Sequence, residues 1–333
     1  MDGSLSPSSN AAGLTTYQLS KDLTLYHFKQ PVESTQDEAS RLLLERFANS
    51  TVNNQEQDAD SALDDTDTAI VVIADSQIKG RGTQGRTWEL ANQDNHNNKY
   101  DPNKSNDNID ERHNLYMTLA LPMDKIPTRL TLLPLQIAVT IAQHIQNTLS
   151  NCQQDPSSVK VKWPNDVLVK DAKISGTLIE NLSVGATTYL LIGMGVNVAY
   201  TPPLQNSPGK QIRPATNLYD ECLAGQPQGT TPNVPTALDF GSHVASALVE
   251  WVGTSSSTKT GQRDVIKEQK VINQWKSLAA FGKAYELRGQ VAEENKGSYQ
   301  GEIVTPIDIQ DDGQLVVVDQ KGQQRTLVAE YMF

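Results

Sequence analysis

The sequence predicts an α+β protein, in which helices flank a mixed β-sheet and a small β-barrel follows at the C-terminus. Two observations carry this prediction. Two consecutive hairpin patterns between Val159 and Ile192 indicate antiparallel strands, whereas a doubly wound α/β fold alternates strands with helices. From about Leu278 onward, short strand patterns separated by turns such as Asp311-Asp312-Gly313 and Lys321-Gly322 replace the helical patterns.

Length and composition set the broad class. At 333 residues the chain exceeds the usual size of one domain, so a main domain with an appendage is expected. The net charge of −11 argues against a general affinity for nucleic acid, and we expect no DNA binding. The two cysteines, Cys152 and Cys222, fit neither a disulfide framework nor a zinc motif. Because no signal-peptide core or long apolar run occurs, we expect a cytoplasmic protein without a membrane segment.

Three segments lack apolar periodicity: residues 1–16, 49–67 and 89–113. They are rich in small polar, acidic or Asn/Asp residues, so they bury too little apolar surface to offset the entropy of ordering. We predict a disordered N-terminal tail and two disordered insertions. Plain loop insertions are the favoured interpretation, and a regulatory or partner-binding role is the alternative.

Helical patterns occur in both halves of the main domain. Thr35-Gln36-Asp37-Glu38 has the spacing of a capping box, so a helix should begin near Thr35. Pro134 suits the first turn of a second, amphipathic helix. The Pro/Gly-rich stretch Thr201–Pro235 predicts a loop. Two further helices are predicted at Ala237–Val252 and Arg263–Trp275.

Strands are predicted where apolar residues run continuously or alternate. Those of the main sheet are expected at Ala69–Ala74, Leu115–Leu121, Val159–Trp163, Val167–Val169, Ile174–Leu182 and Thr188–Ile192. Those of the barrel are expected at Ala284–Leu287, Gly301–Pro306, Gln314–Asp319 and Gln324–Ala329.

A glycine-rich basic loop, Gly80-Arg81-Gly82-Thr83-Gln84-Gly85-Arg86-Thr87, follows the first of these strands. Its glycines permit close backbone approach to an anion, and Arg81 and Arg86 add charged donors, so it favours phosphate binding. An exposed glycine-rich turn is the alternative. A P-loop would need a helix directly after it, but the segment following Trp88 has no helical pattern.

A second motif, Lys162-Trp163-Pro164-Asn165-Asp166, ends an alternating strand at a turn. Lys173 follows on the return strand, where hairpin geometry would let it point at whatever the glycine-rich loop holds. A structural turn with a surface lysine is the alternative. Gly193-Met194-Gly195-Val196-Asn197 suits close packing against a flat ligand, or a bulge.

Taken in order, these motifs resemble the successive signatures of the biotin protein ligase (holocarboxylase synthetase) family. The resemblance covers roughly Tyr17–Phe333, and the pattern GRGxxGRxW, KWPND, KxxGxLxE and GxGxN in one order is highly specific. The segments that carry it are Glu33-Ser34-Thr35-Gln36, Gly80–Trp88, Asn114-Leu115-Tyr116, Lys162–Asp166, Lys173–Glu180 and Gly193–Asn197.

The resemblance implies a class II synthetase-like catalytic domain over residues 17–277 and an SH3-like barrel over residues 278–333. The bifunctional bacterial members carry an N-terminal helix-turn-helix, for which Met1–Gln30 is too short. We therefore expect a ligase that is not a repressor. Family members often pair through a strand edge, so a homodimer is one expected assembly.

The implied activity is that of an ATP-dependent, AMP-forming biotin--[acetyl-CoA-carboxylase] ligase. The biotin carboxylate attacks the α-phosphate of ATP to give biotinyl-5′-AMP and pyrophosphate. A lysine of a biotin carboxyl carrier protein domain, in acetyl-CoA carboxylase or a related carboxylase, then takes the biotinyl group. The expected cofactors are ATP, biotin and Mg²⁺, the last held through phosphates rather than by protein ligands.

The resemblance also implies residue roles. Lys173, Arg81 and Asp166 are the expected catalytic residues: Lys173 bridges the biotin carboxylate and the α-phosphate, and Asp166 orients or deprotonates the carrier lysine. Biotin is expected to meet Ser34, Thr35, Gln36, Gln77, Arg81, Gly82, Thr83, Lys173, Gly176, Gly193 and Gly195. ATP or the adenylate is expected to meet Gly80, Arg81, Arg86, Trp88, Lys162, Asn165 and Asn197.

Two positions depart from the family pattern. Thr83 stands where many members have a second arginine associated with retaining the adenylate, and Gln36 stands where asparagine is commoner. Two other functions were weighed. A lipoate or octanoate protein ligase or transferase resembles this family in fold, but the basic loop and KWPND argue against it. A non-catalytic biotin-binding regulator is disfavoured by Lys173 and Arg81.

Overall fold

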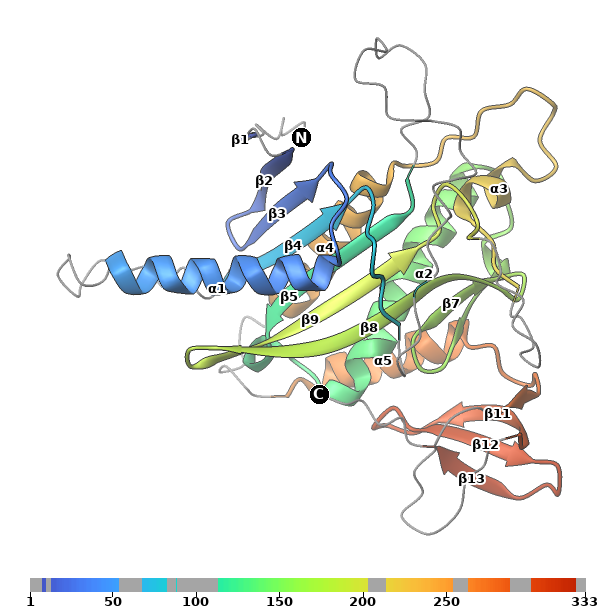
Figure 1. Ribbon diagram of the computed structural model, residues 1–333. Helices are drawn as coiled ribbons and strands as arrows, with labels where there is room; N and C mark the ends of the chain where they lie inside the picture. Colours follow the sequence, from blue (N-terminus) through green and yellow to red (C-terminus); the bar gives the residue numbers. More distant parts are fainter. Residues whose placement is uncertain are drawn as a thin grey trace.

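The computed structural model of the protein describes residues 8–9, 13–53, 68–82, 88, 113–202, 214–253, 263–287 and 301–327. Most of the two predicted insertions therefore lies outside the described residues. Figure 1 shows a main domain built around one large sheet, with a smaller sheet beside it at the C-terminal end of the chain.

A nine-stranded mixed sheet forms the centre of the main domain, in the order β1-β2-β3-β4-β5-β9-β8-β7-β6. Neighbouring strands are antiparallel except β3 and β4, which are parallel. The strands are β1 (Ser8–Ser9), β2 (Leu14–Ser20), β3 (Leu23–Phe28), β4 (Ala69–Ala74), β5 (Leu115–Pro122), β6 (Val159–Lys162), β7 (Asp166–Val169), β8 (Ala172–Val184) and β9 (Thr187–Val196). The predicted α+β class is confirmed.

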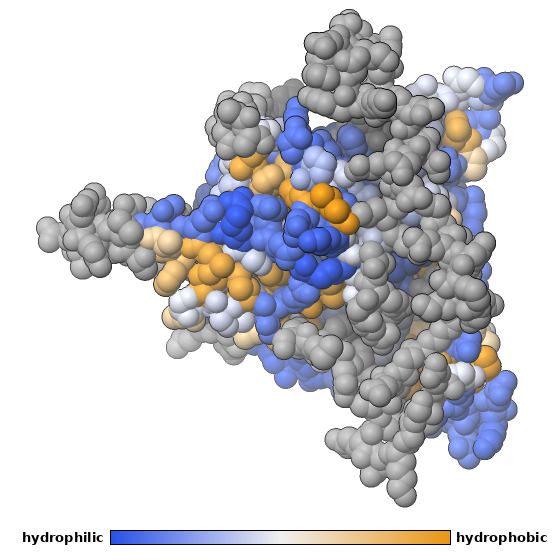
Figure 2. Space-filling view, viewed as in Figure 1, coloured by the Kyte–Doolittle hydropathy of each residue, from blue (hydrophilic) through white to orange (hydrophobic). Residues whose placement is uncertain are grey.

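Helices cover both faces of this sheet (Figure 1). Helix α1 (Thr35–Asn53) packs on one face over β4, β5 and β9, while α2 (Leu133–Asn151), α4 (Ala237–Gly253) and α5 (Val265–Leu278) lie on the other. Figure 2 shows a hydrophilic strip along α1, where Arg41 and Glu45 are exposed, although Leu44 of the same helix is also 50% exposed. None of the helices in the described ranges is both long and apolar enough to cross a membrane.

Successive side chains of a strand point to opposite faces of the sheet, so one strand can contribute to the hydrophobic core on each face. On β4, Ile70 and Val72 pack in the smaller core with α1, whereas Val71 and Ile73 belong to the larger core beneath α2 and α4. All four are fully buried, which accounts for the continuous apolar run in this part of the sequence.

The C-terminal unit, where a small β-barrel was predicted, is a separate four-stranded antiparallel sheet. Its strands are β10 (Tyr285–Glu286), β11 (Ile303–Ile309), β12 (Leu315–Asp319) and β13 (Gln324–Leu327). It is tied to the main domain by Trp163 Nε1, which donates to the carbonyl of Gly313 at 3.0 Å, and by the ion pair of Lys276 with Asp308 at 2.7 Å. The KWPND motif thus contacts both units.

Three predicted boundaries need correction. Strand β2 begins at Leu14, inside the predicted tail, because its pairing with β3 brings the chain into the sheet. Helix α1 continues to Asn53, inside the first predicted insertion, because a helix propagates readily from a packed start. The loop predicted over residues 201–235 contains α3 (Leu218–Leu223), whose cap is Asn217, accepting from the backbone N–H of Asp220 at 2.8 Å.

The start of α1 was predicted at the correct residue but with the wrong cap. Ser34 Oγ accepts from the backbone N–H of Gln36 at 3.1 Å, so Ser34 is the capping side chain. Thr35 Oγ1 instead bonds Thr118 Oγ1 on β5 at 2.9 Å. Glu38 pairs with Arg41 at 2.8 Å rather than turning back toward the helix start. The N-terminus of α1 is thereby fixed directly to the sheet.

Candidate active site

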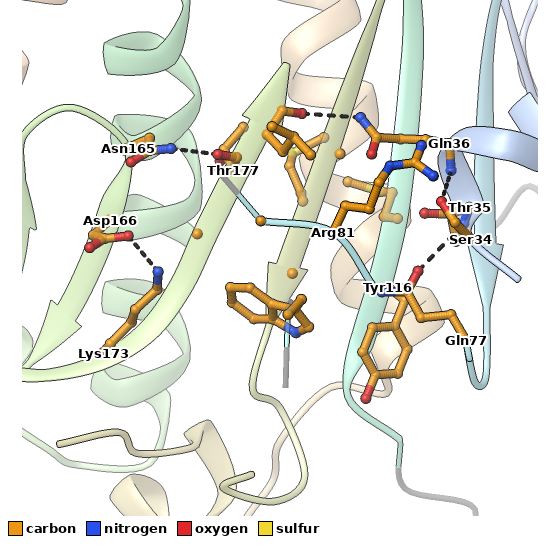
Figure 3. A pocket seen from close by; sticks show the side chains of 18 residues that line it. Ser34, Thr35, Gln36, Gln77, Arg81, Tyr116, Asn165, Asp166, Lys173 and Thr177 are labelled. Carbon is orange, nitrogen blue, oxygen red and sulfur yellow. Dashed lines mark hydrogen bonds and ion pairs between the residues drawn. The ribbon is translucent and has the colours of Figure 1, made fainter. Parts of the chain in front are cut away.

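A pocket opens beside the N-terminus of α1, on the face of the sheet that α1 covers (Figure 3). It contains about 530 Å³ of space, part of it open to solvent. Its lining residues are Ser34, Thr35, Gln36, Gln77, Arg81, Gly82, Trp88, Tyr116, Met117, Asn165, Asp166, Lys173, Gly176, Thr177, Leu178, Gly193, Met194 and Gly195.

Three glycines, Gly176, Gly193 and Gly195, form the pocket floor. Gly195 is paired with Tyr116 on β5 and with Gly176 on β8, and Gly176 is paired in turn with Asp166 on β7. Residues directly opposite one another in a ladder share a face of the sheet. This row across the sheet has side chains only at its ends, Tyr116 and Asp166. The two glycines between them leave space for a ligand.

The indole of Trp88 lies across this floor. A Cβ added at Gly195 would come within 2.6 Å of two Trp88 ring carbons, and one at Gly176 would lie 3.0 Å from the ring and 2.8 Å from Lys173 Nζ. The Lys173 ammonium sits 5.2 Å from the centre of the indole, within cation–π range. The absence of side chains at both glycines is what allows the ring to approach the sheet.

The N-terminus of α1 forms one wall of the pocket. An isolated bridge between Val32 and Gln77 holds the chain before the helix against the segment after β4, and Gln77 Oε1 accepts from the N–H of Thr35 at 3.4 Å. The Gln36 amide lies over Gly193, with Nε2 donating weakly to the carbonyls of Leu178 and Leu191 at 3.5 and 3.4 Å. This leaves the Gln36 carbonyl oxygen as an acceptor.

Lys173 and Asp166 form the opposite wall (Figure 3), with Nζ and Oδ1 only 2.6 Å apart. The backbone of Lys173 is fixed independently, because its N–H donates to Pro214 and its carbonyl accepts from Thr216. Beside this pair, Asn165 Nδ2 donates to the carbonyl of Thr177 at 2.5 Å. A cation and a carboxylate are thus held together at a partly exposed position.

Arg81 lies between the two walls (Figure 3). Its Nη1 contacts both oxygens of Asp37 at 3.0 Å, and its Nη2 contacts Glu180 Oε2 at 3.1 Å. Burial works against the charge of the guanidinium, but the hydrogen bonds to Asp37 and Glu180 outweigh it and raise the pKa of Arg81. Arg81 is therefore a fixed cation at the pocket.

Most of the site residues predicted from the sequence line this pocket. Three predicted residues that the structure describes do not line it. Gly80 accepts from the N–H of Trp88 at 2.9 Å and so closes the base of the loop. Lys162 lies 4.4 Å from the ring centre of Tyr285, toward the C-terminal sheet. Asn197 is buried and donates to the carbonyl of Thr216 at 2.9 Å. Two further predicted residues, Thr83 and Arg86, lie outside the described residues.

Five lining residues carried no predicted role: Tyr116, Met117, Thr177, Leu178 and Met194. Tyr116 could have been found, because it stands in a segment that carried the family resemblance and a strand was predicted there. Its hydroxyl lies 3.4 Å from that of Tyr200, and burial, followed by the influence of Tyr200, raises the pKa of Tyr116 well above its ordinary value. Thr177, Leu178 and Met194 also stand in segments that carried the resemblance, whereas the exposure of Met117 to the pocket depends on strand register, which the sequence does not specify.

Comparison with known proteins places this geometry in context. Residues 109–197 match the model of the Biotin/lipoate A/B protein ligase family. The Biotin--[acetyl-CoA-carboxylase] ligase of Paracoccus denitrificans is 25% identical over 265 residues, which are 79% of this chain and 89% of that protein. The Bifunctional ligase/repressor BirA of Escherichia coli is 28% identical over 128 residues, which are 38% of this chain and 32% of that protein. The chain thus aligns with about a third of BirA.

Two solved structures share the fold over almost the whole chain. The biotin protein ligase of Leishmania major in complex with biotin is 23% identical, with a TM-score of 0.52, and the match covers 93% of this chain and all of that one. The biotin protein ligase of Aquifex aeolicus in complex with biotin and ATP is 19% identical, also with a TM-score of 0.52, covering 94% and 97%. At these identities the likeness establishes the common fold.

Proposed function

We propose that this chain, whose residues 109–197 match the model of the biotin/lipoate A/B protein ligase family, is a biotin protein ligase that activates biotin with ATP and transfers it to a lysine of a carrier domain. The single observation that carries the proposal is the glycine-floored pocket, with Lys173 and Asp166 on one wall and the hydrogen-bonding N-terminus of α1 on the other. Relatives and structures named for biotin, biotinyl-5-AMP and ATP support it.

Biotin binds at the α1 side of the pocket. Ser34, Thr35, Gln36 and Gln77 supply short polar groups suited to the ureido ring. Since the Gln36 amide nitrogen already faces backbone carbonyls, its oxygen is the group that accepts from a ureido N–H. The ligand packs on the pocket floor and reaches toward Arg81 and Gly82, which line the pocket. Thr83 is the remaining biotin contact that the sequence predicts.

Adenylation takes place between Arg81 and Lys173. A biotin carboxylate oxygen forms a bond to the α-phosphorus of ATP, and the bond to the pyrophosphate oxygen breaks. Negative charge gathers on the phosphoryl oxygens, where a prearranged cation stabilises the transition state more than the ground state. Lys173 supplies that cation, and its backbone bonds and its contact with Asp166 hold it ready. Arg86, Trp88 and Asn165 complete the adenylate site.

Transfer then forms an amide. The carrier lysine amine attacks the acyl carbon of the adenylate, AMP departs with the bonding electrons, and the amine loses a proton. Asp166 orients that amine or takes the proton, because its carboxylate lies at the pocket next to Lys173. The carrier is a biotin carboxyl carrier domain, and acetyl-CoA carboxylase is the carboxylase that related enzymes are named for.

Mg²⁺ accompanies the nucleotide. Among the described residues, no group of three His, Cys, Asp or Glu side chains could hold a metal ion. We expect Mg²⁺ to be carried by the phosphates, which it commonly binds in nucleotide sites. When bound there, Mg²⁺ neutralises charge on the departing pyrophosphate. A cytoplasmic location and a homodimer stay predictions from the sequence.

The test is an assay with ATP, biotin and a purified biotin carboxyl carrier domain. We expect biotin-dependent pyrophosphate release without the carrier, and labelling of one carrier lysine when the carrier is added. Omission of Mg²⁺ should abolish both. Release with lipoate or octanoate but not with biotin would instead assign the chain to the other branch of the family, and biotin binding without pyrophosphate release would indicate a non-catalytic binding protein.

A further inference from the structure

Two acidic residues beside the pocket have no part in the proposed reaction. Asp37 stood in the predicted capping box, and Glu180 ended the KxxGxLxE pattern, yet neither received a role. In the structure both carboxylates contact the guanidinium of Arg81, at 3.0 and 3.1 Å. We refer to Asp37, Arg81 and Glu180 as the Arg81 cluster.

The cluster joins three parts of the chain that are distant in sequence. Asp37 lies in the first turn of α1, Arg81 in the glycine-rich loop, and Glu180 on β8. Along β8, Gly176 and Glu180 are separated by an even number of residues, so Glu180 lies on the same face of the sheet as the pocket floor. Arg81 is thereby held at the junction of the helix wall and the floor.

We propose that Asp37 and Glu180 are positioning residues, which hold the Arg81 guanidinium at the pocket so that it is already oriented when the carboxylate of the ligand arrives. The inference rests on the proposed function, because it concerns the anion that the reaction activates. Asp37 and Glu180 do not line the pocket, yet under this proposal they contribute to its affinity for the acid substrate.

The distribution of donors supports positioning. The two carboxylates contact only Nη1 and Nη2, and within the described residues Nε has no partner. An arginine has five N–H groups, so a ligand carboxylate or phosphate can still be bound by those that remain. The flexible arginine side chain would otherwise lose much conformational freedom on binding, and prior ordering removes that loss from the binding step.

Competition between the ligand and the two carboxylates is the opposing effect. Asp37 and Glu180 are 50% and 37% exposed, so water screens their repulsion of an incoming anion. Asp37 also lies in the first turn of α1, where the helix dipole offsets its negative charge. Arg81 lines the pocket while both contacts are made, so the paired conformation is the one that a ligand meets.

The experiment compares Asp37→Asn and Glu180→Gln with a matched control, Glu38→Gln. Glu38 is the neighbouring acidic residue in the same helical turn, but it pairs with Arg41 and not with Arg81. In the biotin-dependent pyrophosphate release assay, we expect each cluster variant to raise the KM for biotin about two- to fivefold, with a smaller change in kcat. The control should keep the wild-type KM, and melting temperatures should show that all variants are folded.

A double-mutant cycle separates positioning from a general effect of charge. In an Arg81→Ala background, Asp37→Asn should leave the KM for biotin unchanged, because the residue acts through Arg81. Glu180→Asp, which keeps the charge but shortens the side chain, should raise the KM as Glu180→Gln does.

Three results would overturn the inference: a lower KM in Asp37→Asn, a KM equal to wild type in all cluster variants, or the same rise in KM with and without Arg81. If the wild-type protein released no pyrophosphate with biotin and ATP, the proposed function would fail and the inference with it. A wild-type enzyme with unaffected variants would refute the inference alone.

Discussion

Replacing Gly195 by alanine adds one methyl group to the pocket floor. The new Cβ would lie 2.6 Å from two ring carbons of Trp88 and 3.1 Å from its Nε1. Gly195 cannot recede, because β9 is hydrogen-bonded on both sides, to Tyr116 on β5 and to Gly176 on β8. The ring, and any ligand that packs on this floor, therefore has to rise from the sheet.

The magnitude follows from these distances. Carbon atoms pack best at about 3.5 to 4.0 Å, so the ring must shift by about 1 Å. Crowding in a tight core costs about 1 to 3 kcal/mol, but Trp88 is only half-buried and can move, so we expect the free energy of unfolding to change by less than about 1 kcal/mol. Catalysis is less tolerant, because misplacing a bound substrate by about 1 Å can reduce the rate by about 10²-fold.

The assay is biotin-dependent pyrophosphate release, measured beside urea unfolding. Gly253→Ala, at the end of α4, is the matched control, since its added Cβ would have no neighbour within 4 Å. We expect Gly195→Ala to lose about 10²-fold in kcat/KM while the control stays near wild type. If Gly195→Ala retained both wild-type stability and wild-type activity, this floor would not be the surface on which the substrate lies.

Three further predictions concern single side chains. Lys173→Ala should lower both adenylation and transfer by about 10² to 10³-fold, measured as pyrophosphate release and carrier labelling, and a normal rate would remove Lys173 from the mechanism. Trp163→Phe deletes the 3.0 Å bond to Gly313 and should lower the free energy of unfolding in urea by about 1 kcal/mol; no change would show that this link contributes nothing. The hydrogen bond from Arg263 lowers the pKa of Glu268, so this stabilisation is present above the ordinary pKa of 4.5 and is lost as pH falls through the folded-state value. Thermal unfolding across that acid range should show it, and Glu268→Gln should remove that part of the pH dependence.

Local patterns in the sequence predicted the elements that local interactions define. The apolar run of β4, the start of α1 at Thr35 and the proline in the first turn of α2 were all found at the expected positions. Helix α3 was missed because it has only six residues, too few for a helical period to emerge, and is set by its cap at Asn217. Strand β2 was missed because its pairing with β3, at the far side of the sheet, determines its place.

In the candidate site, too, local patterns predicted some features, while others depend on contacts between distant parts of the chain. Motif order predicted that Lys173 and Asp166 act at one site, and they lie 2.6 Å apart. The contact of Arg81 with Glu180 joins residues 99 positions apart, and no local pattern encodes it. Lys162 lies in a motif with Asp166, yet its ammonium faces Tyr285 because the C-terminal sheet is placed beside that strand.

The pocket floor has a consequence for changing the range of acids that the proposed enzyme would accept. Its depth is set by Gly176, Gly193 and Gly195, and because no amino acid is smaller than glycine, mutation cannot deepen it. Room for a bulkier acid must come from the walls, where shortening Gln36 would remove the amide that lies over Gly193. For smaller or thinner acids the opposite change is available at Gly193, where an added methyl group would reduce the space and would meet the Gln36 side chain at 3.1 Å.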